Sequence, residues 1–153
     1  GELATEPLFD EDRIILAPNG HPLAAHARVQ LADLADHELL LEPPGTAFRD
    51  ELDDEAARAG IELHAQAEID GIRLLTSLAF EGFGPAMVTA TAAPPWIELA
   101  CRRVGVDGLR PRSVGLATLR RGRLSAPARA VRAAIRDLVA ATDQDGVHPT
   151  LAG

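Results

Sequence analysis

Hydrophobic positions along the chain follow two periods, that of β-strands and that of helices. Strands are predicted over residues 14–17, 38–42, 63–68, 86–89 and 114–119. The first is a β-rich run that stops at the turn signal Pro18-Asn19-Gly20. The second encloses three leucines and indicates a buried strand, whereas the third alternates apolar and polar residues, as a half-buried strand does.

Helical spacing fills the intervals between these strands. Helices are predicted over residues 47–59, from Ile72 to near Gly82, and over residues 126–141, with one short helical turn from Leu31 to Ala35. Thr46 can cap the first helix and Gly60 can end it, while Ser125 can cap the last. Alternating strands and helices predict an α/β fold with a mostly parallel sheet. Residues 142–153 show no period, so a flexible tail is expected there.

Composition restricts the class of protein. The 153 residues are 46% hydrophobic but only 3% aromatic, enough for one ordinary core or one lobe of a two-lobed domain. No apolar run approaches the ~20 residues that span a bilayer. The single cysteine, Cys101, excludes an internal disulfide and fits a reducing compartment. A soluble, cytoplasmic protein without a membrane segment is therefore expected.

Charge is distributed unevenly along the chain. The net charge is −8, which argues against the whole chain binding nucleic acid. Residues 1–101 hold five arginines and nineteen acids, whereas residues 102–136 hold ten arginines and Asp107 alone. A basic segment can mark a nucleic-acid-binding tail, but no aromatic residues interleave these arginines. Solvent-facing arginines that attract the acidic part of the chain or a partner are the simpler interpretation.

The sequence lacks the short motifs of catalysis. It has no nucleophile elbow, no phosphate-binding loop, no paired C-x-x-C and no H-E-x-x-H, so neither an enzyme nor a cofactor is predicted. A metal site formed by His21, His26 and His37 is conceivable, but three loop histidines are more typical of solvated side chains, and no metal is predicted. Cys101 fits a small hydrophobe, although Arg102 and Arg103 beside it could lower its pKa.

The order of several segments resembles one known family. The segments are Glu6-Pro7-Leu8-Phe9-Asp10-Glu11-Asp12, His21-Pro22-Leu23-Ala24, Leu31-x-x-Leu34-Ala35-Asp36, a helix opening at Thr46 and carrying Arg49, Gly60-Ile61, Ala79-x-x-Gly82-Phe83-Gly84, and Arg121-Gly122-Arg123-Leu124-Ser125. Each is weak alone, but together they span about residues 3–140 in a single order. They resemble the effector-binding domain of LysR-type transcriptional regulators.

The resemblance implies a periplasmic-binding-protein-like (type 2) α/β fold with two lobes and a small-molecule cleft. Residues 1–11 would cross from the first lobe, residues 12–106 would form the effector-binding lobe II, and residues 107–141 would return a strand and a helix to lobe I. Residues 142–153 would be the tail. The winged helix-turn-helix and the opening of the first lobe have no counterpart in the sequence, which is expected to be a truncated part of such a regulator.

The candidate ligand-binding residues lie at two strand-to-helix junctions. The helix beginning after Thr46 presents free amides suited to a carboxylate or phosphate, and the resemblance places Thr46, Ala47 and Phe48 against the effector. The second junction, Asp70-Gly71-Ile72, should border the same cleft at the carboxyl ends of the strands. Capping alone for Thr46 and core packing for Phe48 are the simpler alternatives. Arg49 is expected to pair with an acid such as Asp53.

Two functions remain open on these observations. The first is the sensing module of a dimeric transcription factor, with a small anionic or aromatic carboxylate as effector and with DNA bound only through an absent N-terminal domain. The second is a free-standing solute-binding or enzymatic α/β domain. The helix at 126–141 is expected to associate with another chain, as in a homo-oligomer, or to leave apolar surface exposed.

Overall fold

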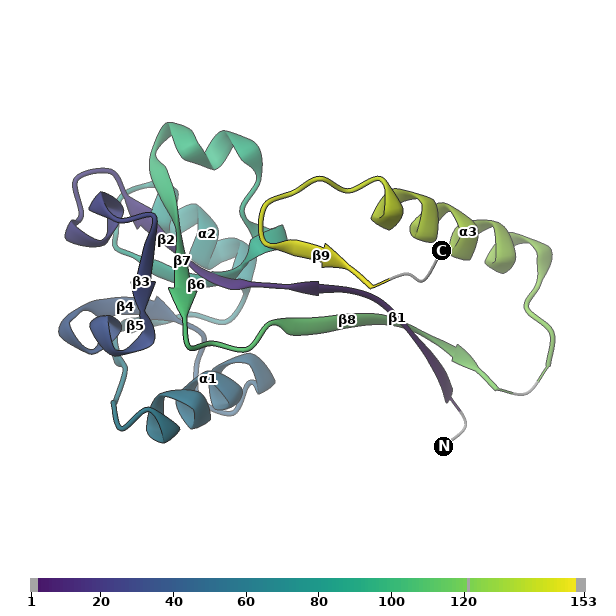
Figure 1. Cartoon of the computed structure of the whole chain (residues 1–153), viewed down its shortest axis with the longest axis horizontal. Helices are drawn as coiled ribbons and strands as arrows, with labels where there is room; N and C mark the ends of the chain where they lie inside the picture. The colour runs from purple at the N-terminus through teal and green to yellow at the C-terminus, as the bar shows by residue number, and fades with distance from the viewer. Residues whose placement is uncertain (1–2, 121, 151–153) are drawn as a thin grey trace. The chain divides into compact units, whose positions relative to one another are not determined.

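The computed structural model describes residues 3–120 and 122–150, which form two compact units (Figure 1). The larger unit comprises residues 12–110, and the smaller unit comprises residues 1–11 together with residues 111–153. Arg121 of the segment quoted above and residues 151–153 of the expected tail lie outside the described residues. The mixed strand and helix content confirms the predicted α/β class.

A six-stranded sheet organises the larger unit. Its strands are β2 (Arg13–Pro18), β3 (Arg28–Gln30), β4 (Glu38–Leu41), β5 (His64–Glu68), β6 (Ala86–Thr89) and β7 (Cys101–Asp107), in the order β3-β7-β2-β6-β4-β5. β2 runs antiparallel to both of its neighbours, β6 and β7, while the other pairings are parallel. The sheet is therefore mostly parallel, as predicted, but one strand in its interior is reversed.

Two helices cover opposite faces of this sheet. Alternate residues of β2 belong to different apolar clusters: Ile15 packs with Leu52 of α1 (Ala47–Arg58), and Leu16 packs with Leu75 of α2 (Ile72–Phe80). Strand side chains alternate between faces, so α1 and α2 bury different sides of the same strands (Figure 1). Four 3₁₀ segments complete the unit: Pro22–Ala25, Leu31–Asp36, Ala90–Ala92 and Pro95–Leu99.

The limits of α1 follow from its end residues, as the sequence predicts. Thr46 has extended backbone and its side chain accepts a hydrogen bond from the Arg49 amide. At the other end Gly60 has a φ of +75°, and the Ile61 amide donates to the Ala56 carbonyl. The left-handed conformation of Gly60, together with this hydrogen bond, ends the helix at Arg58, with Ala59 as the C-cap residue.

The smaller unit is a three-stranded antiparallel sheet with one helix. Its strands are β1 (Leu3–Glu11), β8 (Arg112–Leu119) and β9 (Val147–Pro149), in the order β8-β1-β9, and its helix is α3 (Ala126–Ala140). The Ser125 side chain caps α3 as predicted, accepting from the Ala128 amide at 3.3 Å. Val131 and Leu138 of α3 are 59% and 72% exposed, so apolar surface is open along this helix.

Four strands, β1, β3, β7 and β9, were not predicted, and β3 and β9 have only three residues each. The expected flexible tail is wrong for residues 147–149, because β9 pairs with β1 and the Thr150 amide donates to the Leu8 carbonyl. A strand of three residues is too short to show a period of two. β7 was missed since two arginines and Gly105 interrupt its apolar residues, and β1 was missed since polar residues and Pro7 fill most of it.

Candidate ligand site at the carboxyl ends of β4 and β5

β4 and β5 are parallel neighbours, and a helix follows each of them after a short loop. α1 follows β4, and α2 follows β5. Leu41 is in register with Glu68, and the Ile69 amide donates to the Leu41 carbonyl at 2.8 Å. Because α1 follows β4 on one face of the sheet and α2 follows β5 on the other, the chain diverges at this point. In open α/β sheets, ligands usually bind at the carboxyl ends of neighbouring strands whose following helices lie on opposite faces.

The start of α1 has backbone N–H donors, whereas the Thr46 hydroxyl is already engaged in hydrogen bonds with neighbouring backbone groups. Thr46 Oγ1 donates to the Pro43 carbonyl at 3.0 Å and accepts from the Arg49 amide at 3.3 Å. The amides of Ala47 and Phe48 occupy the first two helical positions, where no intrahelical acceptor exists. These two amides, rather than the Thr46 hydroxyl, are the donors of this turn that have no acceptor within the helix.

The side chains at this first turn differ in exposure. Ala47 is exposed, whereas Phe48 is half-buried and packs against the apolar cluster that contains Leu52. Part of the Phe48 side chain is therefore buried against the core. The Asp50 carboxylate accepts a hydrogen bond from the Gly45 amide at 2.8 Å and adds negative charge beside the helix start, which weakens its positive potential.

The start of α2 lacks a side-chain cap. Gly71 is the N-cap residue, with a φ of +114°, a backbone conformation that disfavours any residue carrying a Cβ. Its carbonyl accepts from the amides of Leu74 and Leu75, which leaves the Ile72 and Arg73 amides without intrahelical acceptors. Asp70 is exposed and does not cap the helix, while Ile72 packs against the cluster on the α2 face.

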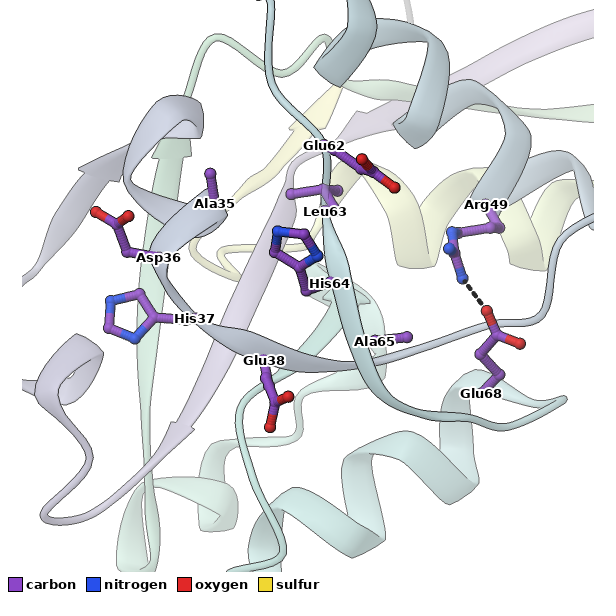
Figure 2. A pocket seen from close by; sticks show the side chains of 10 residues that line it. All are labelled: Ala35, Asp36, His37, Glu38, Arg49, Glu62, Leu63, His64, Ala65 and Glu68. Atoms are coloured by element: carbon purple, nitrogen blue, oxygen red, sulfur yellow. Dashed lines mark hydrogen bonds and ion pairs between the residues drawn. The ribbon is translucent and has the colours of Figure 1, made fainter.

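A buried arginine connects the two strand ends. The Arg49 guanidinium donates to the Asp53 carboxylate at 2.8 Å, to the Glu42 carbonyl at 2.8 Å and to Glu68 Oε1 at 3.2 Å, the last shown in Figure 2. The predicted pairing with Asp53 is confirmed. Helical spacing reveals that partner, but the contact to Glu68 on another strand was missed because nothing local signals it.

An open hollow of about 550 Å³ lies beside the edge strand β5 (Figure 2). Its ionisable lining residues are Asp36, His37, Glu38, Arg49, Glu62, His64 and Glu68. None of the six residues predicted at the helix starts lines it. Four carboxylates against one arginine make this hollow a poor site for an anion.

The histidines do not assemble the conceivable metal site. The His21 and His37 rings lie 5.4 Å apart, and His21 Nδ1 accepts a hydrogen bond from the Leu23 amide at 3.1 Å. Burial and then the charge of His37 lower the pKa of His21. Within residues 3–120 and 122–150, no three His, Cys, Asp or Glu side chains are grouped so that they could hold a metal ion.

The cysteine is unsuited to thiolate chemistry. Cys101 begins β7, is 1% exposed and packs in the cluster on the α2 face. Burial raises the pKa of its thiol, so the suggestion that Arg102 and Arg103 lower it is wrong. Since Arg102 is exposed and donates to the Ala24 carbonyl, its charge lies in solvent rather than at the sulfur. The interpretation of Cys101 as a small hydrophobe stands.

Comparisons with known proteins agree on one family. Residues 1–140 match the family model described as the LysR substrate binding domain. A probable hydrogen peroxide-inducible genes activator of Mycobacterium avium is 32% identical over 101 residues, which are 65% of this chain and 32% of that protein. The chain thus spans about a third of the length of the curated relatives it matches.

Among the described residues, no helix is long and apolar enough to cross a bilayer.

Solved structures show the same fold. The regulatory domain of CcmR from Synechocystis PCC6803, in complex with 2-PG, matches with a TM-score of 0.76 at 16% identity, over 92% of this chain and 69% of that one. The effector-binding domain of QuiR, in complex with shikimate, matches with a TM-score of 0.73 at 16% identity, over 91% and 66%. These matches confirm the predicted periplasmic-binding-protein-like (type 2) fold. The chain belongs to the LysR substrate-binding domain family.

Proposed function

We propose that this chain is the effector-sensing module of a LysR-type transcriptional regulator that acts in the cytoplasm. In this proposal the larger unit contains the effector-binding lobe II, expected over residues 12–106, and the smaller unit contributes a strand and a helix to lobe I. DNA contacts belong to an N-terminal domain, and the working regulator is a homo-oligomer. Membership of the LysR substrate-binding domain family supports a role in sensing rather than in catalysis.

The proposed effector is a small carboxylate bound between the starts of α1 and α2. Thr46, Ala47 and Phe48 would contact it from one side, and Asp70, Gly71 and Ile72 from the other. The observation that carries this proposal is that two helices on opposite faces begin at neighbouring strand ends with unpaired amides. Amides at a helix start, together with the helix dipole, bind anions. The shikimate named for QuiR is itself a carboxylate.

Individual side chains suggest how the ligand is selected. The half-buried Phe48 and Ile72 offer apolar surface to the body of a ligand. Asp70 is exposed and would repel a carboxylate directly beside it, so its proposed role is to accept a hydrogen bond from a ligand hydroxyl. A hydroxylated or aromatic acid fits this combination better than a simple inorganic anion.

Peroxide sensing by a thiol of this chain is not part of the proposal. The name of the Mycobacterium avium relative refers to hydrogen peroxide. In this chain the single thiol is buried and its pKa is raised, which opposes formation of the reactive thiolate. We therefore propose reversible ligand binding as the signal, without cofactor or metal.

The test removes one amide donor while keeping the helix. Ala47→Pro eliminates the N–H at the first helical position, where proline is tolerated, and Thr46 already has the extended backbone that must precede a proline. Ala126→Pro is the matched control at the first position of α3, after the extended Ser125. Binding of sodium shikimate and sodium benzoate is measured by titration calorimetry.

We expect the carboxylates to bind the unmodified chain and the Ala126→Pro variant equally, and to bind Ala47→Pro about tenfold more weakly, since a hydrogen bond to a charged acceptor is lost. Equal affinity of Ala47→Pro and the unmodified chain for either acid would contradict the proposed site.

A further inference from the structure

A buried ion pair lies at the beginning of β2. Arg13 is 3% exposed, and Glu55, which lies on α1, is 8% exposed. Arg13 Nη2 is 2.5 Å from Glu55 Oε1. Burial by itself would raise the pKa of Glu55, but the Arg110 amide and the Arg13 guanidinium outweigh it and hold that pKa below its usual value. Glu55 is therefore the charged partner of a charged Arg13.

The same pair holds the peptide group of Arg110. Arg13 Nε and Nη2 donate to the Arg110 carbonyl at 3.1 and 2.7 Å, and the Arg110 amide donates to Glu55 Oε2 at 2.9 Å. Arg13 follows the first residue of the larger unit, Asp12, and Arg110 is the last residue of that unit. The ion pair thus fastens one end of this unit to the other.

One donor of this network has no partner. Arg13 Nη1 is buried and makes no hydrogen bond to any described residue, although Nε and Nη2 of the same guanidinium are both engaged. An arginine cannot relieve this by losing its proton, because it stays charged at any pH that proteins experience. Buried donors normally find a partner, so an unpaired charged one indicates an acceptor supplied from outside the chain.

A small cavity of about 110 Å³ adjoins this arginine. Arg13 lines it together with Asp12, Arg28, Asp107 and the apolar Val106. Arg28 and Asp107 neutralise each other through an ion pair of 2.6 Å. The volume exceeds the roughly 30 Å³ share of one water molecule severalfold, but it is too small for an aromatic acid.

We propose that this cavity is a second binding site, for a small monovalent anion such as formate or acetate, whose oxygen accepts a hydrogen bond from Arg13 Nη1. A carboxylate of three or four heavy atoms fits the volume and supplies the missing acceptor with a charge-assisted bond. Bound there, the anion strengthens the contacts of Arg13 that hold the two ends of the larger unit together. This site is separate from the starts of α1 and α2 and does not depend on the function proposed for them.

Thermal unfolding of the chain in increasing sodium formate and sodium acetate, at constant ionic strength, tests the proposal. Val106→Ile fills the cavity with one additional methylene and leaves every charged group in place. Val104→Ile is the matched control, because Val104 lies in the same strand and the same apolar cluster but does not line the cavity. Arg13→Gln removes the unpaired donor itself.

We expect a saturable rise in the unfolding midpoint with either anion for the unmodified chain and for Val104→Ile, as a ligand specific for the native state produces. The apparent affinity should fall about tenfold or more in Val106→Ile and disappear in Arg13→Gln. A response that is absent from the unmodified chain, as when water alone occupies the cavity, or that is equal in Val106→Ile and Val104→Ile, would overturn the proposal, even if Arg13→Gln fails to fold.

Discussion

The two units of this chain are stabilised by different interactions. The larger unit buries both faces of its sheet, with apolar clusters that include Ile15 on one side and Leu16 on the other. The smaller unit buries few side chains, among them Leu8 and Val139, and leaves Leu119, Val131 and Leu138 more than half exposed. Its helix α3 is held to β1 by ion pairs from Arg132 and Arg136 to Glu6.

This difference in apolar burial indicates that the larger unit contributes most of the free energy of unfolding. Apolar burial contributes about 25 cal/mol per Å², so a sheet covered on both faces accounts for most of the favourable free energy. Exposed ion pairs contribute little, because solvent screens them. The related effector domains are longer than this chain, which covers 66–69% of two of them.

The largest expected contrast is between the buried and the exposed ion pairs. Glu55→Ala should lower the free energy of unfolding by about 3–5 kcal/mol, because it leaves the buried Arg13 without a countercharge. Glu6→Ala should cost about 1 kcal/mol or less, since Arg132 and Arg136 are 41% and 45% exposed. Urea unfolding of both variants measures this, and equal losses would contradict the division between the units.

The next contrast compares two leucines. Leu41→Ala removes a fully buried side chain from the core of the larger unit and should cost about 2–5 kcal/mol. Leu138→Ala removes a side chain that is 72% exposed on α3 and should change the free energy of unfolding by less than about 0.5 kcal/mol. A large loss in Leu138→Ala, measured by the same urea titration, would mean that α3 is covered in solution, for example by a second copy of the chain.

Side-chain packing explains part of what the sequence could predict. Leu52 and Leu75 fall on helical stripes because both helices cover a hydrophobic sheet, so α1 was located together with its cap and α2 from its stripe alone. β1 and β9 pair mainly through backbone hydrogen bonds, and their side chains show little alternation of burial. Strand pairing through the backbone leaves no pattern in residue types. For this reason a flexible tail was expected where β9 forms.

The candidate site shows the same limit. The positions of Thr46 and Gly71 at helix starts follow from local signals, a capping hydroxyl and a glycine after a strand. The link from Arg49 to Glu68 and the clamp of Arg13 and Glu55 on Arg110 join residues 19 to 97 positions apart. Contacts between residues so far apart in the sequence depend on which strands pair and in which register. A single sequence does not reveal that register.

The acid sensitivity of the larger unit should come in part from Glu55. Its native pKa lies below the ordinary value of 4.5, so the unfolded chain takes up a proton first as the pH falls. The stability that this carboxylate contributes is complete above about pH 5 and is lost as the pH drops through the native pKa. The difference in unfolding free energy between the unmodified chain and Glu55→Gln should therefore shrink between about pH 5 and pH 3. A difference that stays constant over this range would show that Glu55 is not ionised in the native state.

The smallest effect on stability, but a clear one on surface properties, is expected on α3. Leu138→Ser should leave the free energy of unfolding within about 0.5 kcal/mol of the unmodified chain, because the side chain is already largely in water. It should reduce binding of the dye ANS and any self-association seen by light scattering, since it divides the apolar strip that Val131 and Leu138 form. Ala133→Ser, at another exposed position of α3, is the control and should change neither property. An unmodified chain that is monomeric and binds no ANS would show that the exposed leucine and valine are too far apart to act as one surface, and the contrast between the two units would then rest on the ion pairs alone.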